Sequence, residues 1–255
     1  MSAWLKVARA NDHLRELQGR ERAFFDLKAY MHVQEQDSEV GDRKSAVILP
    51  PPEDFGLIIG DIVHNLRSAL DHIIWSLSHL PKSAALTPKE ERAIGFPIVD
   101  SAPAYTATMQ RHPGPLPPNL PSGVAAEVAL LQPHHGWNNP TRFLLWVIQE
   151  LDRIDKHRLV VVTTSAAVQG VHGVPLENPM RTFTGPIKSG TVVPLRPGQD
   201  GKPEMDMDLD APLVIAFDIG PVRHPVEGFQ VEYTLSRATL VIAHDILPRF
   251  ARFGI

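Results

Sequence analysis

The sequence has no cysteine, which excludes disulfide bonds, thiolate metal ligands and cysteine nucleophiles. It also lacks any apolar run of about 18 residues, the length that a membrane-spanning helix needs. Its first segment is charged throughout and has no apolar core of the kind found in signal peptides. These absences predict a soluble cytoplasmic protein that does not act at a membrane.

Positive charge and aromatic side chains are also scarce. The chain has 25 Lys and Arg against 29 Asp and Glu, a formal net charge of −4, so it has no general attraction for nucleic-acid phosphates. Aromatic residues make up 7% of the chain and are not interleaved with basic residues, which argues against an RNA-stacking surface. The glycine-rich signatures of nucleotide-binding loops and the nucleophile elbow of α/β hydrolases are absent as well.

Helical spacing of apolar residues dominates the first 160 residues. It predicts helices over residues 3–28, 53–80, 121–132 and 141–157. Residues 30–36 and 45–49 are predicted to be two strands around the polar turn 38–43, which gives a β-hairpin at 30–49, inserted between the first two helices. The stretch 81–123 is rich in proline and has little periodicity, so we expect an ordered loop there, with an extended piece at 96–98 and a short helix near 104–110.

After residue 158 the pattern changes to β-branched, alternating segments punctuated by glycine and proline. It predicts four or five antiparallel strands between 159 and 219, and then a C-terminal helix over 234–253 that is kinked or ends near Pro248. We therefore expect an α+β fold in two parts. Residues 1–160 form a helical bundle with the inserted β-hairpin, and residues 161–255 form a β-rich antiparallel segment with a C-terminal helix, packed on the same core.

The segment 60–77 stands out because ionisable residues interrupt an otherwise apolar helix. At about 100° per residue, one face carries only apolar side chains: Ile59, Ile62, Leu66, Ala69, Leu70, Ile73 and Leu77. The opposite face is polar and consists of Asp61, His64, Asn65, Ser68, Asp71 and His72. A polar stripe of this kind is either a solvated surface or a functional site.

Two motifs carry a resemblance to a known group of proteins. HNLRSALDH at 64–72 and LDRIDKHR at 151–158 resemble a family of uncharacterised bacterial proteins with a GD-x-x-HNLRSALDH helix and a second helix ending in LDRIDKHR. The resemblance covers most of residues 1–165, including FPI at 96–98 and LQP at 131–133, and is weaker in the β-rich part. Because the family has no established activity, the resemblance implies which residues matter but not what they do.

Arg67 and His72 also fit the R-x4-H form of the motif that marks the HEPN superfamily, and this more distant resemblance implies a function. Many members of the superfamily resemble metal-independent endoribonucleases of toxin and defence systems, with RNA as substrate and no cofactor. By this resemblance Arg67 and His72 are catalytic, and His64, Asn65 and Asp71 orient them. An imidazole can exchange a proton with a ribose oxygen, while a guanidinium stabilises charge on the phosphoryl group. A homodimer is implied, because such sites form where two copies of the motif helix face each other.

We expect the polar stripe to meet the end of the helix over 141–157, so that Asp155, His157 and Arg158 complete the site. Two alternatives remain. Asp61, His64 and His157 could bind a divalent metal ion, because helical bundles build such sites from facing helices. The motif could also be a structural polar network that fixes helix pairing in a non-enzymatic, dimeric module, since buried charges are tolerated when they are paired.

Overall fold

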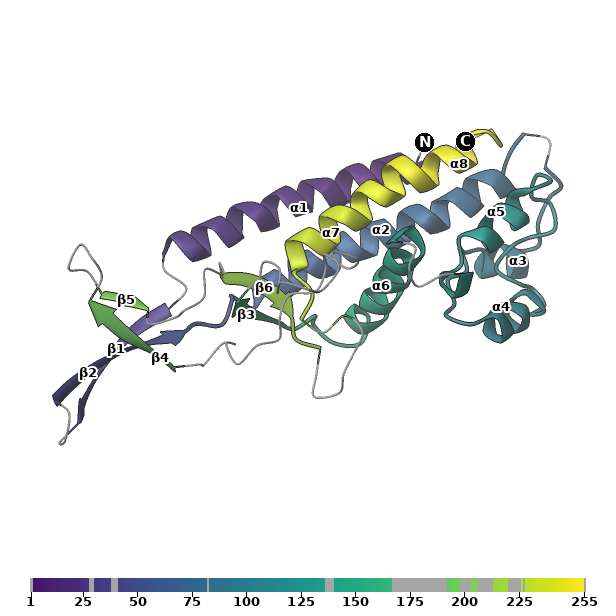
Figure 1. The fold of residues 1–255 in the computed structure, drawn as a ribbon. Helices are drawn as coiled ribbons and strands as arrows, with labels where there is room; N and C mark the ends of the chain where they lie inside the picture. The colour runs from purple at the N-terminus through teal and green to yellow at the C-terminus, as the bar shows by residue number, and fades with distance from the viewer. Residues whose placement is uncertain are drawn as a thin grey trace. The chain divides into compact units, whose positions relative to one another are not determined.

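The fold is described from a computed structural model of residues 2–27, 30–37, 41–81, 83–135, 140–166, 192–197, 203–205, 213–219, 226 and 228–254 (Figure 1). The described residues are mostly helical and include two small antiparallel sheets, so the predicted α+β class is confirmed. The longer helices are α1 (Ser2–Asp26), α2 (Asp54–Ser78), α6 (Pro140–Asp155) and α7 (Val231–Val241). The shorter ones are α3 (Pro88–Ala93), α4 (Ala102–Met109), α5 (Val124–Leu130), η1 (Pro133–His135), η2 (Ile242–Ile246) and α8 (Leu247–Ala251).

The predicted hairpin is confirmed. β1 (Tyr30–Asp37) pairs antiparallel with β2 (Gly41–Ile48), with Tyr30 opposite Ile48 and Asp37 opposite Gly41. β2 begins earlier than predicted, because the polar residues of the expected turn also pair in the ladder. The hairpin then joins the later part of the chain, since β2 also pairs with β4 (Val192–Pro197).

The β-rich segment contains four described strands. β4 also pairs with β5 (Pro203–Met205), which gives one sheet in the order β1-β2-β4-β5. β3 (Val162–Ala166) pairs with β6 (Leu213–Phe217) in a second sheet. Much of the region 159–219, in which four or five strands were predicted, lies outside the described residues, including 167–191 and 206–212.

The helices differ from the sequence prediction at two places. Helix α3 was not predicted, although Thr87 and Glu90 form a capping box at its start. Near Pro248 the C-terminal helix continues to Ala251 through the π-helical turn η2, in which the N–H of Leu247 donates to the carbonyl of Ile242. A π turn of this kind relieves the backbone bonding that a proline disrupts.

The chain clusters into two compact units, each described by itself below. Unit 1 comprises Met1–Arg15, Ile58–Leu159 and Thr234–Ile255, and unit 2 comprises Glu16–Leu57 and Val160–Tyr233. From the sequence, a single boundary near residue 160 is predicted. The hairpin belongs to unit 2, whose strand β4 pairs with it, and the C-terminal helical segment from Thr234 onward belongs to unit 1.

The core of unit 1 contains the apolar face of α2. The seven residues predicted for that face are fully buried: Ile59, Ile62, Leu66, Ala69, Leu70, Ile73 and Leu77. The solvent exposure of the polar face varies along the helix: Asp61 and His64 are exposed, whereas Asn65 is buried. Within the described part of the chain, no helix is both long enough and apolar enough to cross a lipid bilayer.

Candidate functional site

Arg67 and Asp71 of α2 bind the backbone of Phe96. Nη2 of Arg67 donates to the Phe96 carbonyl at 2.8 Å, and the Phe96 N–H donates to Oδ1 of Asp71, also at 2.8 Å. Nη1 of Arg67 lies 2.9 Å from the same Oδ1 and forms an ion pair with it. Because residues four apart share a helix face, the two side chains act together on the backbone of one residue. Both polar backbone groups of Phe96 are thereby satisfied without a neighbouring strand.

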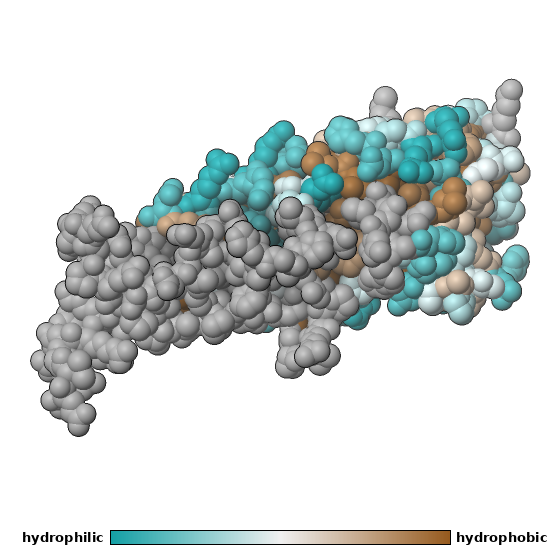
Figure 2. Space-filling model, in the orientation of Figure 1, coloured by the Kyte–Doolittle hydropathy of each residue, from teal (hydrophilic) through white to brown (hydrophobic). Residues whose placement is uncertain are grey.

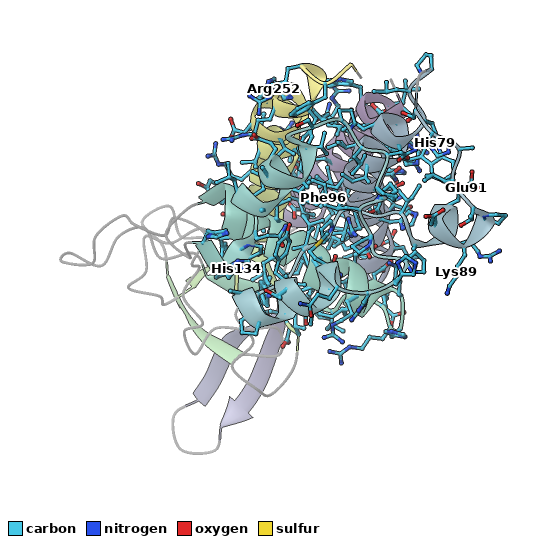
Figure 3. All side chains as sticks on the ribbon, turned by 90° about the vertical axis from the view of Figure 1, so that its right-hand side faces the viewer. His79, Lys89, Glu91, Phe96, His134 and Arg252 are labelled. Carbon is cyan, nitrogen blue, oxygen red and sulfur yellow. The ribbon has the colours of Figure 1, made fainter. Side chains whose placement is uncertain are left out.

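The segment around Phe96 is held from a second side by Gln132, which follows α5. The Gln132 side chain is fully buried, donates to the Pro97 carbonyl at 2.8 Å and accepts from the Val99 N–H at 3.1 Å. The Phe96 ring packs edge to face against Phe250, with ring centroids 6.0 Å apart. Phe96 therefore lies inside the helical part of the chain, whereas His79 and Glu91 lie at its edge (Figure 3). The FPI and LQP segments thus contact each other, and FPI contacts the polar motif of α2.

A second polar cluster forms where α2 crosses α6. The carboxylate of Asp155 lies over Gly60 so closely that a Cβ atom at position 60 would be 2.2 Å from Oδ1 of Asp155. Only 2% of the Asp152 side chain is exposed. Its Oδ1 lies 3.7 Å from Nδ1 of His64, and its Oδ2 lies 2.5 Å from Nζ of Lys156. The α6 helix thus presents two carboxylates to the first part of the polar stripe.

These carboxylates affect one another. Burial raises the pKa of Asp155, and the nearby charges of Asp152 and Asp61 raise it further, while His64 and Lys156 oppose the shift. The crossing therefore concentrates negative charge that is balanced in part by one lysine and one histidine.

His72 occupies a third environment. Its Nδ1 is buried and has no hydrogen-bond partner among the described residues. Burial lowers the pKa of His72, and Lys6 of α1 lowers it further, while Asp71 acts in the opposite direction. The imidazole is therefore neutral near pH 7 and retains one unused ring nitrogen.

The structure divides the predicted site. His64 and Asp155 lie at the α2–α6 crossing, as the sequence analysis expected for the whole motif, but Arg67 and Asp71 contact Phe96 instead. Asn65 donates from Nδ2 to the Asp61 carbonyl at 2.8 Å, within its own helix. His157 and Arg158 follow the last residue of α6, and both are exposed.

The metal alternative gains no support from the geometry. Among the residues that the structure describes, no group of three or more His, Asp or Glu side chains is placed to hold a metal ion. Asp61, His64 and His157 do not form such a set.

Sequence reasoning missed three residues that complete these clusters: Gln132, Asp152 and Lys6. Gln132 could have been found as a lone amide after the apolar run of α5, and Asp152 as the partner of Lys156 four residues later. Lys6 gave no signal, because its position next to His72 depends on how α1 packs.

No family model, curated protein or solved structure matches the chain. The fold and the site together define a mainly helical α+β protein whose polar motif makes specific internal contacts.

Proposed function

We propose that the protein is a non-enzymatic, dimeric module in which the polar motif of α2 is a structural network. The observation that carries this proposal is the use of both Arg67 and Asp71 to bind the Phe96 backbone. The motif pairs with the other segments of the family resemblance, since Asp155 of LDRIDKHR packs over Gly60 at its start. A network of this type specifies how helices and loops pack.

The energetics of Arg67 favour this role. Only 15% of its side chain is exposed. Nη2 is hydrogen-bonded to the Phe96 carbonyl, and Nη1 is paired with Asp71 by charge but makes no hydrogen bond, so a contact of Nη2 with a substrate phosphate would release the Phe96 carbonyl. Leaving a buried polar group without its partner costs about 1–3 kcal/mol. Arg67 therefore contributes to the stability of the fold rather than to a transition state.

The endoribonuclease suggested by the HEPN resemblance is the second candidate, and the geometry of His72 favours it. A neutral imidazole with an unused Nδ1 suits a general acid or base acting on a ribose hydroxyl. In this candidate His72 transfers the proton, and no metal ion is required. Arg67 would stabilise the phosphoryl group only after leaving Phe96.

The two candidates are separated by incubating the purified protein with mixed single-stranded RNA, with and without chelator. The samples are the wild type, Arg67→Ala and His72→Ala, with Arg237→Ala and His244→Ala as controls at exposed positions. We expect no cleavage by any sample, and a clear loss of thermal stability in Arg67→Ala alone, because only that change leaves the Phe96 carbonyl unpaired. Chelator-resistant cleavage that is lost in His72→Ala and kept in His244→Ala would overturn the structural proposal in favour of the ribonuclease.

The dimer is proposed from apolar surface on the helices of unit 1. Large apolar side chains that are 43–67% exposed include Trp4, Leu5, Trp75 and Leu240. On the face drawn in Figure 2, hydrophobic residues gather between hydrophilic ones over the helical part of the chain. Exposed apolar surface on a folded protein is typical of protein interfaces.

A further inference from the structure

Two carboxyl groups line the same cleft in unit 2. Glu21 belongs to α1, and Glu232 belongs to the first turn of α7. Gln18 donates from Nε2 to Oε1 of Glu232 at 2.7 Å. Oε1 of Glu21 is buried and has no hydrogen-bond partner among the described residues. Two side chains of the same chemical type therefore occupy unequal environments.

The groups around this pair form a cleft of about 410 Å³. The cleft is lined by Gln18, Glu21, Arg22, Phe25 and Asp26 of α1 and by Glu232 of α7. The charged residues that line the cleft beside Glu21 are Arg22 and Asp26 of its own helix and Glu232 of α7. Negative charge exceeds positive charge here, so ionisation of the buried Glu21 carboxyl adds a repulsive charge to the cleft.

The titration of Glu21 agrees with this geometry. Burial, and to a smaller extent the neighbouring charge of Glu232, raises the pKa of Glu21 from 4.5 to about 8. Glu232 is suited to carry the negative charge, because its position in the first turn of α7 places it at the positive end of the helix dipole. At pH 7 the pair consequently carries one proton on Glu21.

We propose that Glu21 and Glu232, which line one cleft, act as a pH-sensitive latch between α1 and the start of α7, closed while Glu21 carries a proton and weakened when that proton is lost. The folded protein holds this proton more tightly than the unfolded chain does. The stabilisation is therefore complete below the ordinary pKa of a glutamate and is lost as the pH rises through about 8. The inference is independent of the function proposed for the α2 motif.

The test compares the wild type with Glu21→Gln, which has nearly the same shape but cannot ionise. Glu53→Gln is the matched control, because Glu53 is exposed. Urea unfolding midpoints are measured at about pH 6 and about pH 9. We expect the midpoint of the wild type and of Glu53→Gln to fall at the higher pH, and that of Glu21→Gln to fall much less. A drop of equal size in all three proteins would overturn the proposal.

Hydrogen exchange gives a local readout that holds even if Glu21→Gln changes the global stability. With exchange rates corrected for their intrinsic pH dependence, amides of α1 and α7 near the pair should lose protection in the wild type at the higher pH. Amides of α5 should not. In Glu21→Gln the amides near the pair should keep their protection, and loss of protection there in both proteins would contradict the latch.

Discussion

Gly60 is required where it lies because Asp155 approaches the α2 backbone directly at that position. In Gly60→Ala the new Cβ would lie 2.2 Å from Oδ1 of Asp155, so the carboxylate must move away from the helix crossing. We expect the substitution to lower the free energy of unfolding by about 1–3 kcal/mol, the typical cost of overpacking, despite the better helix propensity of alanine. Urea denaturation measures this change.

Gly19→Ala is the matched control for this residue. Gly19 is exposed in α1, and a Cβ there would meet nothing within 4 Å. The same substitution should therefore raise the free energy of unfolding by about 0.5–1 kcal/mol, because alanine restricts the unfolded chain and favours the helix. If both variants were stabilised, the close approach of Asp155 to Gly60 would be wrong.

At the scale of elements, the extended segment 96–99 behaves like a strand whose backbone groups are hydrogen-bonded by side chains. Replacing Gln132 with methionine keeps the size but leaves the Pro97 carbonyl and the Val99 N–H without their partner. Each unpaired buried group costs about 1–3 kcal/mol, so thermal unfolding should shift clearly to lower temperature.

Gln110→Met provides the comparison for this prediction. Gln110 is exposed at the end of α4, so its replacement should change the free energy of unfolding by less than about 0.5 kcal/mol. Hydrogen exchange at the Val99 amide should accelerate in Gln132→Met alone. Equal exchange at Val99 in both variants would show that Gln132 does not hold this segment.

The elements themselves could largely be predicted from sequence. The periodicity of α2 identifies its buried face, because burial of apolar side chains follows the helical repeat directly. The β-hairpin follows from two short segments of strand character on either side of a polar turn. The capping box of α3, with Thr87 and Glu90, was readable as well, although the proline-rich composition around it hid the helix. Such local signals need no knowledge of distant partners.

The site was less predictable, for a geometric reason. Asp61 and Asp71 are ten residues apart, which is about 15 Å along a helix. A crossing helix contacts only part of that length, so α6 reaches the residues near Gly60, and another segment meets those near Asp71. That other partner is the backbone of Phe96, and a backbone group carries no signature in the sequence.

At the scale of the whole molecule, unit 1 depends on contacts between segments that are far apart in the chain. Glu127 of α5, with 9% of its side chain exposed, binds Arg249 at 3.0 Å and Arg252 at 2.6 Å. These ion pairs connect the middle of the chain to its C-terminal helical segment. Arg252 lies on the outside of this segment, so its guanidinium is the solvent-facing side of the pair (Figure 3). The pairing could not be predicted, because more than a hundred residues separate the partners.

The proposed dimer is the prediction that belongs to this scale. We expect light scattering to give twice the mass of one chain, since apolar side chains such as Leu5, 67% exposed, are more stable when covered. Leu5→Lys should shift the mass toward one chain without loss of helical content, because the side chain lies outside the core. Leu27→Lys changes an 84% exposed leucine in unit 2 and should leave the dimer intact. A wild-type mass of one chain at every concentration would rule out the dimer, and an equal shift in both variants would place its interface elsewhere.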